Sequence, residues 1–314
     1  MLRRVIVRLT NTYILRHAGL LSQLFDQDLV KGLVFLAICD ANVGHIDGNA
    51  ETSQRYADLD AQTPDDLRRP IRPHKLALSL GLPRETVRRK VSQLVAEGWL
   101  TETAQGVFAS AQAVNSDAIR RTMKANTGLV IDLFANLARA GVDCPSPPAS
   151  GLAGPPLPHR AISRITAGYC LRSLDELRGL FGGDLLTGLI FSAIIDANVA
   201  YLDKQSEMIH TDLDDQVPDE LRHPTSALAV ASRLNLPRET VRRHVRQLES
   251  VGACAAVKGG LIVPQATLTW PQIVEATVRN AANLRRLLGE LHAAGFPPPL
   301  WSAAPQAAQH KATG

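Results

Sequence analysis

Two short stretches of the sequence carry residue types that can recognise the edges of nucleic-acid bases. The run Leu82–Arg89 recurs letter for letter as Leu236–Arg243, and each copy contains three arginines and one glutamate. A guanidinium can donate a bidentate pair of hydrogen bonds to O6 and N7 of guanine, and a glutamate can accept one from the N4 amine of cytosine. The chemistry that this run predicts is direct contact with base pairs in a major groove.

The candidate residues fall into two groups. We predict base contacts for Arg84, Glu85, Arg89, Arg238, Glu239 and Arg243. We predict contacts to the phosphate backbone, which fix register and make binding salt-dependent, for Thr86, Arg88, Lys90, Thr240, Arg242, Arg246 and Lys258. A purely electrostatic phosphate binder gains nothing from a carboxylate within its contact face, so Glu85 favours base reading.

A helix with one packed face and one presented face must carry these side chains. Val87, Val91 and Leu94 follow one another at spacings of four and three, which places them on one face of a helix, whereas Glu85 and Arg89 point the opposite way. The apolar face would pack against the protein. The charged face would remain available to a partner.

The residues around this helix predict a helix-turn-helix followed by a hairpin. Residues 73–80 form a short apolar helix, and Gly81 suits the positive-φ corner between two helices. The basic helix closes at Gly98, and residues 101–109 contain two short extended runs with a turn at Gln105-Gly106. The second copy repeats this order, with a helix over 227–234, a turn at Asn235, a stop at Gly252 and a hairpin turn at Gly259-Gly260.

This order of elements resembles the winged helix-turn-helix domains of bacterial transcription regulators. The string Arg84-Glu85-Thr86-Val87 with Arg89 is similar to the recognition helix of the cyclic-AMP receptor protein family. In that family the residues that match Arg84, Glu85 and Arg89 read base edges, so the resemblance implies the same role here and in the second copy. The chain departs from the family in having Pro83 and Pro237 at the N-cap, and nothing in it resembles the cyclic-nucleotide-binding barrel.

The sequence indicates an internal duplication that extends over most of the chain. Outside the basic helices, Phe25, Asp28 and Gly32 reappear as Phe181, Asp184 and Gly188. We therefore predict a mainly α protein with small β-hairpin wings, built from two tandemly duplicated winged helix-turn-helix domains. The first covers 1–143, with its helix-turn-helix at about 73–97 and its wing at about 99–109; the second covers 159–301, with the same parts at about 226–251 and 253–264.

Each unit is expected to contain further helices around the predicted DNA-binding segment. In the first unit these are a helix from about residue 10 to 24, a long apolar helix over 26–46, and a final helix over about 113–140, with an irregular acidic loop after the apolar helix. A Pro-rich linker, 144–158, joins the units, and 302–314 are predicted to form a disordered tail. An extended linker of this length reaches about 40 Å, enough for both basic helices to engage half-sites about 34 Å apart.

Two repeated polar segments have no role in this scheme. Asp40-Ala41-Asn42 recurs as Asp196-Ala197-Asn198, and Asp58-Leu59-Asp60 recurs in the second unit at 212–214. Their oxygen atoms could hold a divalent cation, but the spacing of a calcium loop is missing. The structural interpretation is favoured: these side chains tie down the loop by bonding its backbone, with Asp40 paired to Arg68.

Composition narrows the class of protein. The chain has 314 residues, a net charge of +4 and four cysteines without metal-ligand or disulfide spacing. We expect no metal, no cofactor and no membrane span, because no apolar run of spanning length is evident. A glycine-rich phosphate loop, a nucleophile elbow and a repeated His/carboxylate cluster are all missing from the sequence, so we expect no enzyme. A cytoplasmic, nucleoid-associated protein is the expectation.

The function predicted from the sequence is sequence-specific binding of double-stranded DNA by a transcription regulator. Its two basic helices would act as a covalent pseudo-dimer on a repeated or inverted half-site. A plasmid-type replication initiator is the nearest alternative, and a winged-helix protein-interaction module that does not bind DNA is a second one. The sequence leaves open the operator, activation against repression, a small-molecule effector, and the pairing of two chains into a homodimer.

Overall fold

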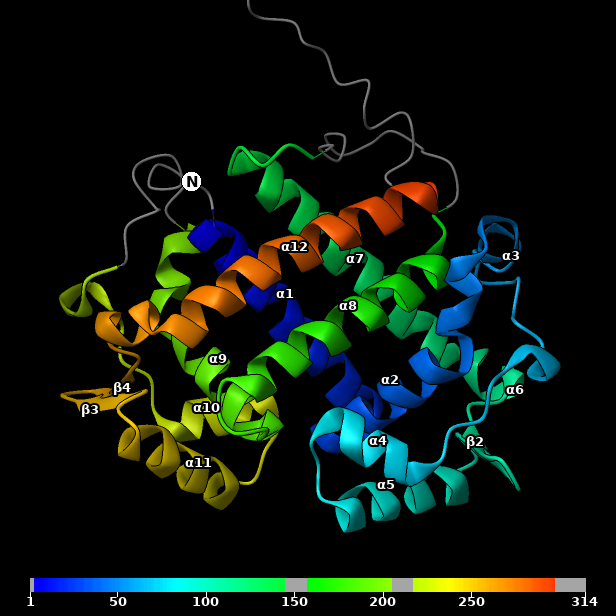
Figure 1. Ribbon diagram of the computed structural model, residues 1–314, viewed down its shortest axis with the longest axis horizontal. Coiled ribbons are helices and arrows are strands. Elements are labelled where there is room, and N and C mark those ends of the chain that lie inside the picture. The colour runs from blue at the N-terminus through cyan, green and yellow to red at the C-terminus, as the bar shows by residue number, and fades with distance from the viewer. Residues whose placement is uncertain (1–2, 145–156, 205–216, 297–314) are drawn as a thin grey trace, which may run out of the picture.

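The computed structural model describes residues 3–144, 157–204 and 217–296 of the chain. Within these ranges the protein is mainly helical and has two small antiparallel sheets of two strands each (Figure 1). The predicted class, mainly α with small hairpins, is confirmed at this level. Most of the predicted linker, the predicted tail and the segment 212–214 lie outside the described residues.

The elements follow the same order in the two halves of the chain. The first half contains α1 (Arg3–Leu24), α2 (Leu29–Val43), η1 (Gly44–Gly48), α3 (Ala50–Arg55), η2 (Asp65–Leu67), α4 (Pro73–Leu80), α5 (Arg84–Ala96), β1 (Thr101–Thr103), β2 (Gly106–Phe108), α6 (Ala111–Val114) and α7 (Asp117–Arg139). The second half contains α8 (His159–Gly179), α9 (Leu185–Val199), η3 (Ala200–Lys204), η4 (Asp219–Leu221), α10 (Ala227–Leu234), α11 (Arg238–Ser250), β3 (Ala255–Val257), β4 (Gly260–Ile262), η5 (Gln265–Thr269) and α12 (Pro271–Ala293).

The first half differs from the sequence prediction in two places. Helix α1 begins at Arg3 instead of about residue 10, because its first turns pack in the interior, where Val5 is 4% exposed. The acidic loop contains the short helix α3, whose N-cap Asn49 accepts a hydrogen bond from the backbone N–H of Thr52. The asparagine N-cap is a local signal for a helix that the sequence analysis did not use.

Helices α1 and α8 run through the centre of the molecule and join its two halves. Helix α1 packs on α2 and α7 of its own half and on α12 of the other, and α8 packs on α9, α12, α2 and α7 (Figure 1). Tyr13 stacks on His17, whose Nδ1 lies 3.0 Å from Sγ of Cys170. The Tyr13 hydroxyl also donates to Asn126, which in turn donates to Thr166 of α8. A buried polar network therefore ties the two central helices together.

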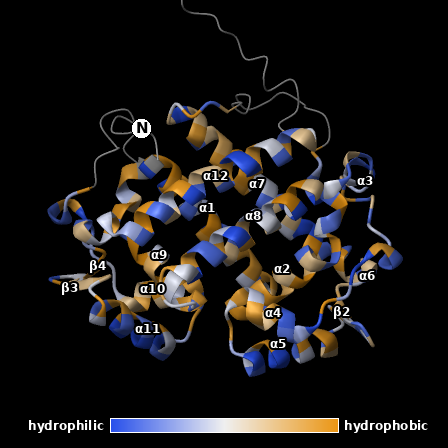
Figure 2. Ribbon diagram, viewed as in Figure 1, coloured by the Kyte–Doolittle hydropathy of each residue, from blue (hydrophilic) through white to orange (hydrophobic). Residues whose placement is uncertain are grey.

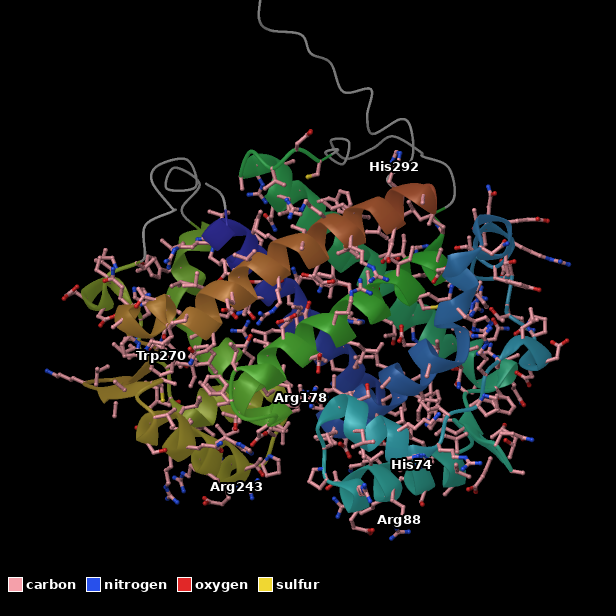
Figure 3. The ribbon with its side chains drawn as sticks, viewed as in Figure 1. His74, Arg88, Arg178, Arg243, Trp270 and His292 are labelled. Atoms are coloured by element: carbon pink, nitrogen blue, oxygen red, sulfur yellow. The ribbon has the colours of Figure 1, made fainter. Side chains whose placement is uncertain are left out.

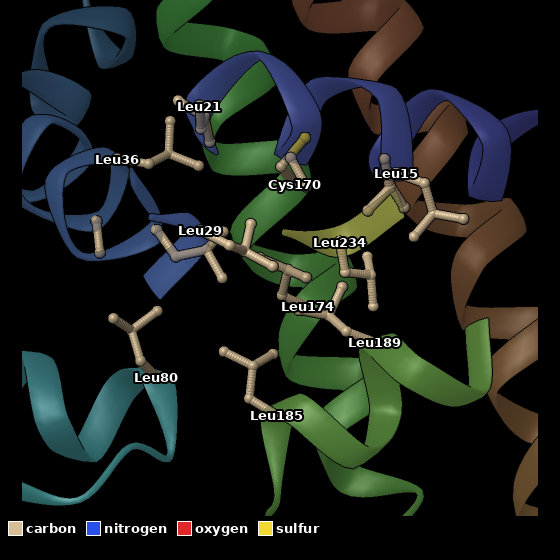
Figure 4. Packing of buried hydrophobic residues seen from close by; sticks show 14 of the residues in the cluster. Leu15, Leu21, Leu29, Leu36, Leu80, Cys170, Leu174, Leu185, Leu189 and Leu234 are labelled. Carbon is tan, nitrogen blue, oxygen red and sulfur yellow. The ribbon is translucent and has the colours of Figure 1, made fainter. Parts of the chain in front are cut away.

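The N-terminal turns of α8 dock on the first half rather than on their own. The Arg160 guanidinium, which is buried, donates to the carbonyl of Leu59, and Arg164 forms an ion pair of 2.9 Å with Asp47. Leucines from both halves lie in one continuous hydrophobic cluster (Figure 4). The relative position of the two halves is thus fixed by packing and ion pairs between them.

The two most apolar helical segments are core elements. Leu29–Gly48 and Leu185–Leu202 are long and apolar enough to cross a membrane by length and composition alone, so the expectation that no such run exists was wrong. In the structure, 67% and 72% of these segments are buried inside the protein. Burial on several sides explains their near-continuous apolar character.

The repeated asparagines hold the hairpins against these core helices. Asn42 donates to the carbonyls of Arg69 and Val107 and accepts from the N–H of Ala109. Asn198 makes the equivalent three bonds, to His223, Leu261 and Val263. The structural interpretation of these two asparagines is therefore confirmed.

The aspartates of the same segments behave differently. Arg68 pairs with Asp65 at 3.1 Å and donates to the carbonyl of Thr63, so the expected pair with Asp40 was wrong. Burial raises the pKa of Asp40, and the charge of Arg172 opposes that rise. Asp196, its counterpart, accepts hydrogen bonds from Thr12 of α1 and Arg233 of α10.

Candidate nucleic-acid interface

The turn before each basic helix has the geometry that the sequence predicts. Gly81 ends α4 with φ of 61°, and Asn235 ends α10 with φ of 51°, both in the left-handed region that glycine and asparagine tolerate. A Cβ at Gly81 would lie 2.4 Å from Cδ of Arg178 and 2.6 Å from the carbonyl oxygen of Gly183. Glycine is thus required in the first half by close packing as well as by φ.

Each basic helix buries the apolar face that its spacing predicts. On α5, Val87 and Leu94 are fully buried and Val91 is 5% exposed; on α11, the matching Val241, Val245 and Leu248 are equally buried. Both helices begin after a proline that makes no side-chain cap, as the sequence indicates. Their stability must therefore come from this packed face and from anchors to the core.

Helix α5 is anchored to α2 by two ion pairs. Lys31, which is buried, pairs with Glu97 at the C-terminal end of α5, and Lys90 pairs with Asp28, the N-cap residue of α2. The Lys90 side chain is 13% exposed. It points toward the core and not outward with the arginines, so the structure lends no support to the predicted phosphate contact of Lys90.

Helix α11 is anchored to α9 by a histidine at the position of Lys90. His244 is buried, with its Nδ1 2.7 Å from Oγ1 of Thr187 and 3.3 Å from a carboxylate oxygen of Asp184. Burial raises the pKa of Asp184, but hydrogen bonds from His244 and Thr187 outweigh it and lower the pKa to about 2. The carboxylate therefore stays ionised and holds α11 in place.

The outward face of both helices is basic. Arg84, Arg88 and Arg89 on α5 are exposed, as are Arg238, Arg242, Arg243 and Arg246 on α11, whereas Thr86 and Thr240 are half-buried. Arg88 and Arg243 extend away from the body of the protein (Figure 3), and the outer side of α11 is strongly hydrophilic (Figure 2). Among the described residues, neither Arg84 nor Arg89 forms an ion pair with a carboxylate.

The two glutamates on these faces pair with arginines of the same helix. Glu85 forms a bidentate contact with Arg88, at 2.6 and 2.8 Å, and Glu239 accepts from Arg242 at 2.8 Å. The hydrogen bond from Arg88 lowers the pKa of the Glu85 carboxyl. Both pairs are exposed, so they restrain the side chains only weakly and leave the carboxylates free to accept from another donor.

The hairpins contribute unequally to this surface. Both are extended by one further backbone bridge, Ile71 to Val107 in the first half and Thr225 to Leu261 in the second. Lys258 is exposed at the turn of the second hairpin. The first hairpin offers Glu102 and Gln105 near its turn, so it carries no matching cation.

Two exposed cations near the basic helices were not predicted from the sequence. Arg72, the N-cap of α4, and Lys75 on its first turn are exposed, and their counterparts are Ser226 and Ala229. The signal that could have found them is their position at the start of α4, the short helix that precedes α5. The first half thus has cations on α4, and the second has Arg246 and Lys258 instead.

Helices α5 and α11 lie at the same end of the molecule, on either side of its centre (Figure 1). The predicted base-contacting residues of both halves are therefore brought to one side of the protein. Comparison with known proteins found no matching protein-family model, no matching curated protein and no matching solved structure.

Proposed function

We propose that the protein binds double-stranded DNA in a sequence-specific manner and regulates transcription. The observation that carries the proposal is the pair of helices α5 and α11, each with a buried apolar face and an outward face of arginines around one glutamate, at one end of the molecule. A helix of this kind fits the major groove, where arginine and glutamate distinguish base pairs. In this proposal the two halves are tandem winged helix-turn-helix units that act as a covalent pseudo-dimer.

Every predicted residue except Lys90 has a role in the proposal. Arg84, Glu85 and Arg89, with their counterparts on α11, would contact base edges. The exposed arginines Arg88, Arg242 and Arg246, the threonines at 86 and 240, and Lys258 would contact phosphates. Arg72 and Lys75 join this second group on structural grounds.

Selection of bound fragments from random duplex DNA would test the proposal and define the site. We expect one recovered motif with two half-sites, bound with an affinity that falls steeply with salt. The double variant Arg84→Ala/Arg238→Ala should lose sequence preference. The matched control Arg139→Ala/Arg285→Ala removes two exposed arginines from α7 and α12 and should bind normally. Retained folding with no DNA affinity in the wild type would favour the protein-interaction module.

A further inference from the structure

The second half contains a cavity that the proposed function does not use. It has a volume of about 460 Å³ and lies among α1, α8, α9 and α12. Most of its wall is apolar, formed by residues such as Phe191, Ile195 and Ile273. This volume falls within the range of about 300–1,000 Å³ that small-molecule sites occupy.

The same place in the first half is nearly filled, which gives an internal comparison. There the cavity measures about 120 Å³ and is lined by Leu36 and Met123. The corresponding residues in the second half are the smaller Ser192 and Thr277. Smaller side chains at these two positions accompany the larger cavity of the second half.

A buried arginine marks the polar part of this cavity. Arg222 lines it with a side chain that is 1% exposed and forms an ion pair with Asp219 at 3.3 Å. Its counterpart Arg68 also donates to the carbonyl of Thr63, but within the described residues Arg222 makes no such bond to Val217, and its Nε faces only the Asp219 carboxylate at 3.3 Å. A desolvated guanidinium in an apolar wall favours an anionic partner.

The carboxylates in the wall do not compete for that role. Glu176 pairs with Arg279 at 2.5 Å, and Asp196 pairs with Arg233. Arg4 and Arg8 also line the cavity. The wall thus combines a large apolar surface with arginine side chains.

We propose that this cavity binds an amphipathic organic acid, with its apolar body against α9 and α12 and its carboxylate at Arg222. The wall residue Asp196 is bonded to Thr12 of α1 and to Arg233 of α10, the helix before α11. Asp196 thus connects the cavity wall to α10. An effect on DNA binding would rest on the proposed function above, so the test uses no DNA.

The test measures binding of decanoate and decanol to the full chain by calorimetry, below their aggregation concentrations. Decanoate should bind saturably, with one molecule per chain and at least ten-fold more tightly than decanol. Ser192→Leu/Thr277→Met places the first-half residues in the cavity and should weaken decanoate binding at least ten-fold. Arg222→Gln should abolish the preference for the acid, whereas the matched control Arg68→Gln should keep it.

Three results would overturn the proposal: no saturable binding of decanoate, equal binding of decanol, or unchanged binding by Ser192→Leu/Thr277→Met. A photoreactive diazirine analogue of decanoate provides a second measurement that uses only the wild-type chain. It should label peptides from α9 or α12, and labelling confined to other elements would also refute the site. Neither measurement depends on whether the protein binds DNA.

Discussion

Glu85 and Glu239 distinguish a base reader from a general phosphate binder at the level of single residues. Each sits on an exposed basic face and is held only by an exposed arginine three residues on. A phosphate binder would be improved by removing a carboxylate, because repulsion from the DNA backbone would fall. A base reader would lose discrimination.

For Glu85→Gln/Glu239→Gln we therefore expect the preference for the selected site over a scrambled duplex to fall by about 1–3 kcal/mol per contacted base pair. Affinity for the scrambled duplex should stay constant or rise. Fluorescence anisotropy with both duplexes at one salt concentration measures the ratio. A uniform gain in affinity with an unchanged ratio would contradict base reading by these glutamates.

Arg88 and Lys90 are two residues apart but face different surroundings. The Arg88 side chain is 67% exposed, whereas Lys90 is 13% exposed and paired with Asp28. Arg88→Ala should reduce the slope of log affinity against log salt by about 1, the value for one phosphate contact. Lys90→Met should leave that slope unchanged and lower the free energy of unfolding by about 1 kcal/mol. The salt titration and a urea titration on both variants measure these effects; a reduced slope for Lys90→Met would restore it as a phosphate contact.

Among the elements, the hairpins depend on one asparagine each. Asn42 and Asn198 are fully buried and each satisfies two carbonyls and one N–H near a hairpin. We expect Asn198→Leu to lower the free energy of unfolding by about 2–4 kcal/mol, because buried backbone groups lose their partners. Urea denaturation followed by circular dichroism measures it. Asn136→Leu, on the half-buried side of α7, is the control and should change stability little; equal loss in both would argue against this anchor.

The two basic helices are held to the core by different anchors. Helix α5 uses the Lys31–Glu97 and Lys90–Asp28 ion pairs, whereas α11 uses His244 against Thr187 and Asp184. The packed valines and leucines are the same in both. The outward residues Arg84, Glu85, Arg88 and Arg89 are therefore repeated on α11 while the supporting contacts vary, which fits a role for these residues themselves.

At the scale of the whole molecule, His17 makes the joint between α1 and α8 sensitive to acid. Burial lowers its pKa from the ordinary value of 6.5 to about 4. Between these values the unfolded chain takes up a proton that the folded chain does not, so stability falls as the pH drops from 6.5 to 4 and this effect then levels off. At about 1.4 kcal/mol per pKa unit, the loss is on the order of 3 kcal/mol.

The His17→Phe variant isolates this effect, because the other titrating groups stay in place. Urea denaturation at a series of pH values measures the free energy of unfolding of both proteins. Between pH 6.5 and 4 this free energy should fall by on the order of 3 kcal/mol more in the wild type than in His17→Phe. Asp184 has its lowered pKa near 2, so its contribution is lost below this window. Parallel stability curves for the two proteins would show that His17 does not titrate in this way.

Packing in the core shared by the two halves sets the distance between α5 and α11. The contacts of Arg160 and Arg164 with the first half, and the network around Tyr13, position the halves without the segment 145–156. Insertion of Gly and Ser residues after position 150 should therefore leave DNA affinity unchanged. By contrast, about 5 base pairs added between the half-sites would rotate one of them to the opposite face of the duplex, since a turn takes about 10 base pairs, and should weaken binding strongly. Gel-shift titrations measure both, and tolerance of every half-site spacing would indicate a flexible tether.

Local patterns in the sequence predicted the parts of the structure that depend on near neighbours. The turn residues Gly81 and Asn235 and the buried spacing of Val87, Val91 and Leu94 appear where expected. The hairpin turns lie at 104–105 and 258–259, one residue before the predicted pairs. These features follow from backbone sterics and helical periodicity, which act over a few residues. The N-terminal extent of α1 was missed because it depends on burial against distant elements. Helix α3 was missed because its only local signal is a single N-cap residue.

The sequence alone therefore determined the helical class, the hairpins, and the packed and presented faces of each basic helix. Only the tertiary structure showed that Lys90 is an anchor, that Arg68 pairs with Asp65, and that α1 and α8 cross between the halves. The physical reason is that an ion pair forms between charges that lie close together in space. Lys90 and Asp28 are far apart along the chain, and nothing in their local pattern distinguishes an inward ammonium from an outward one.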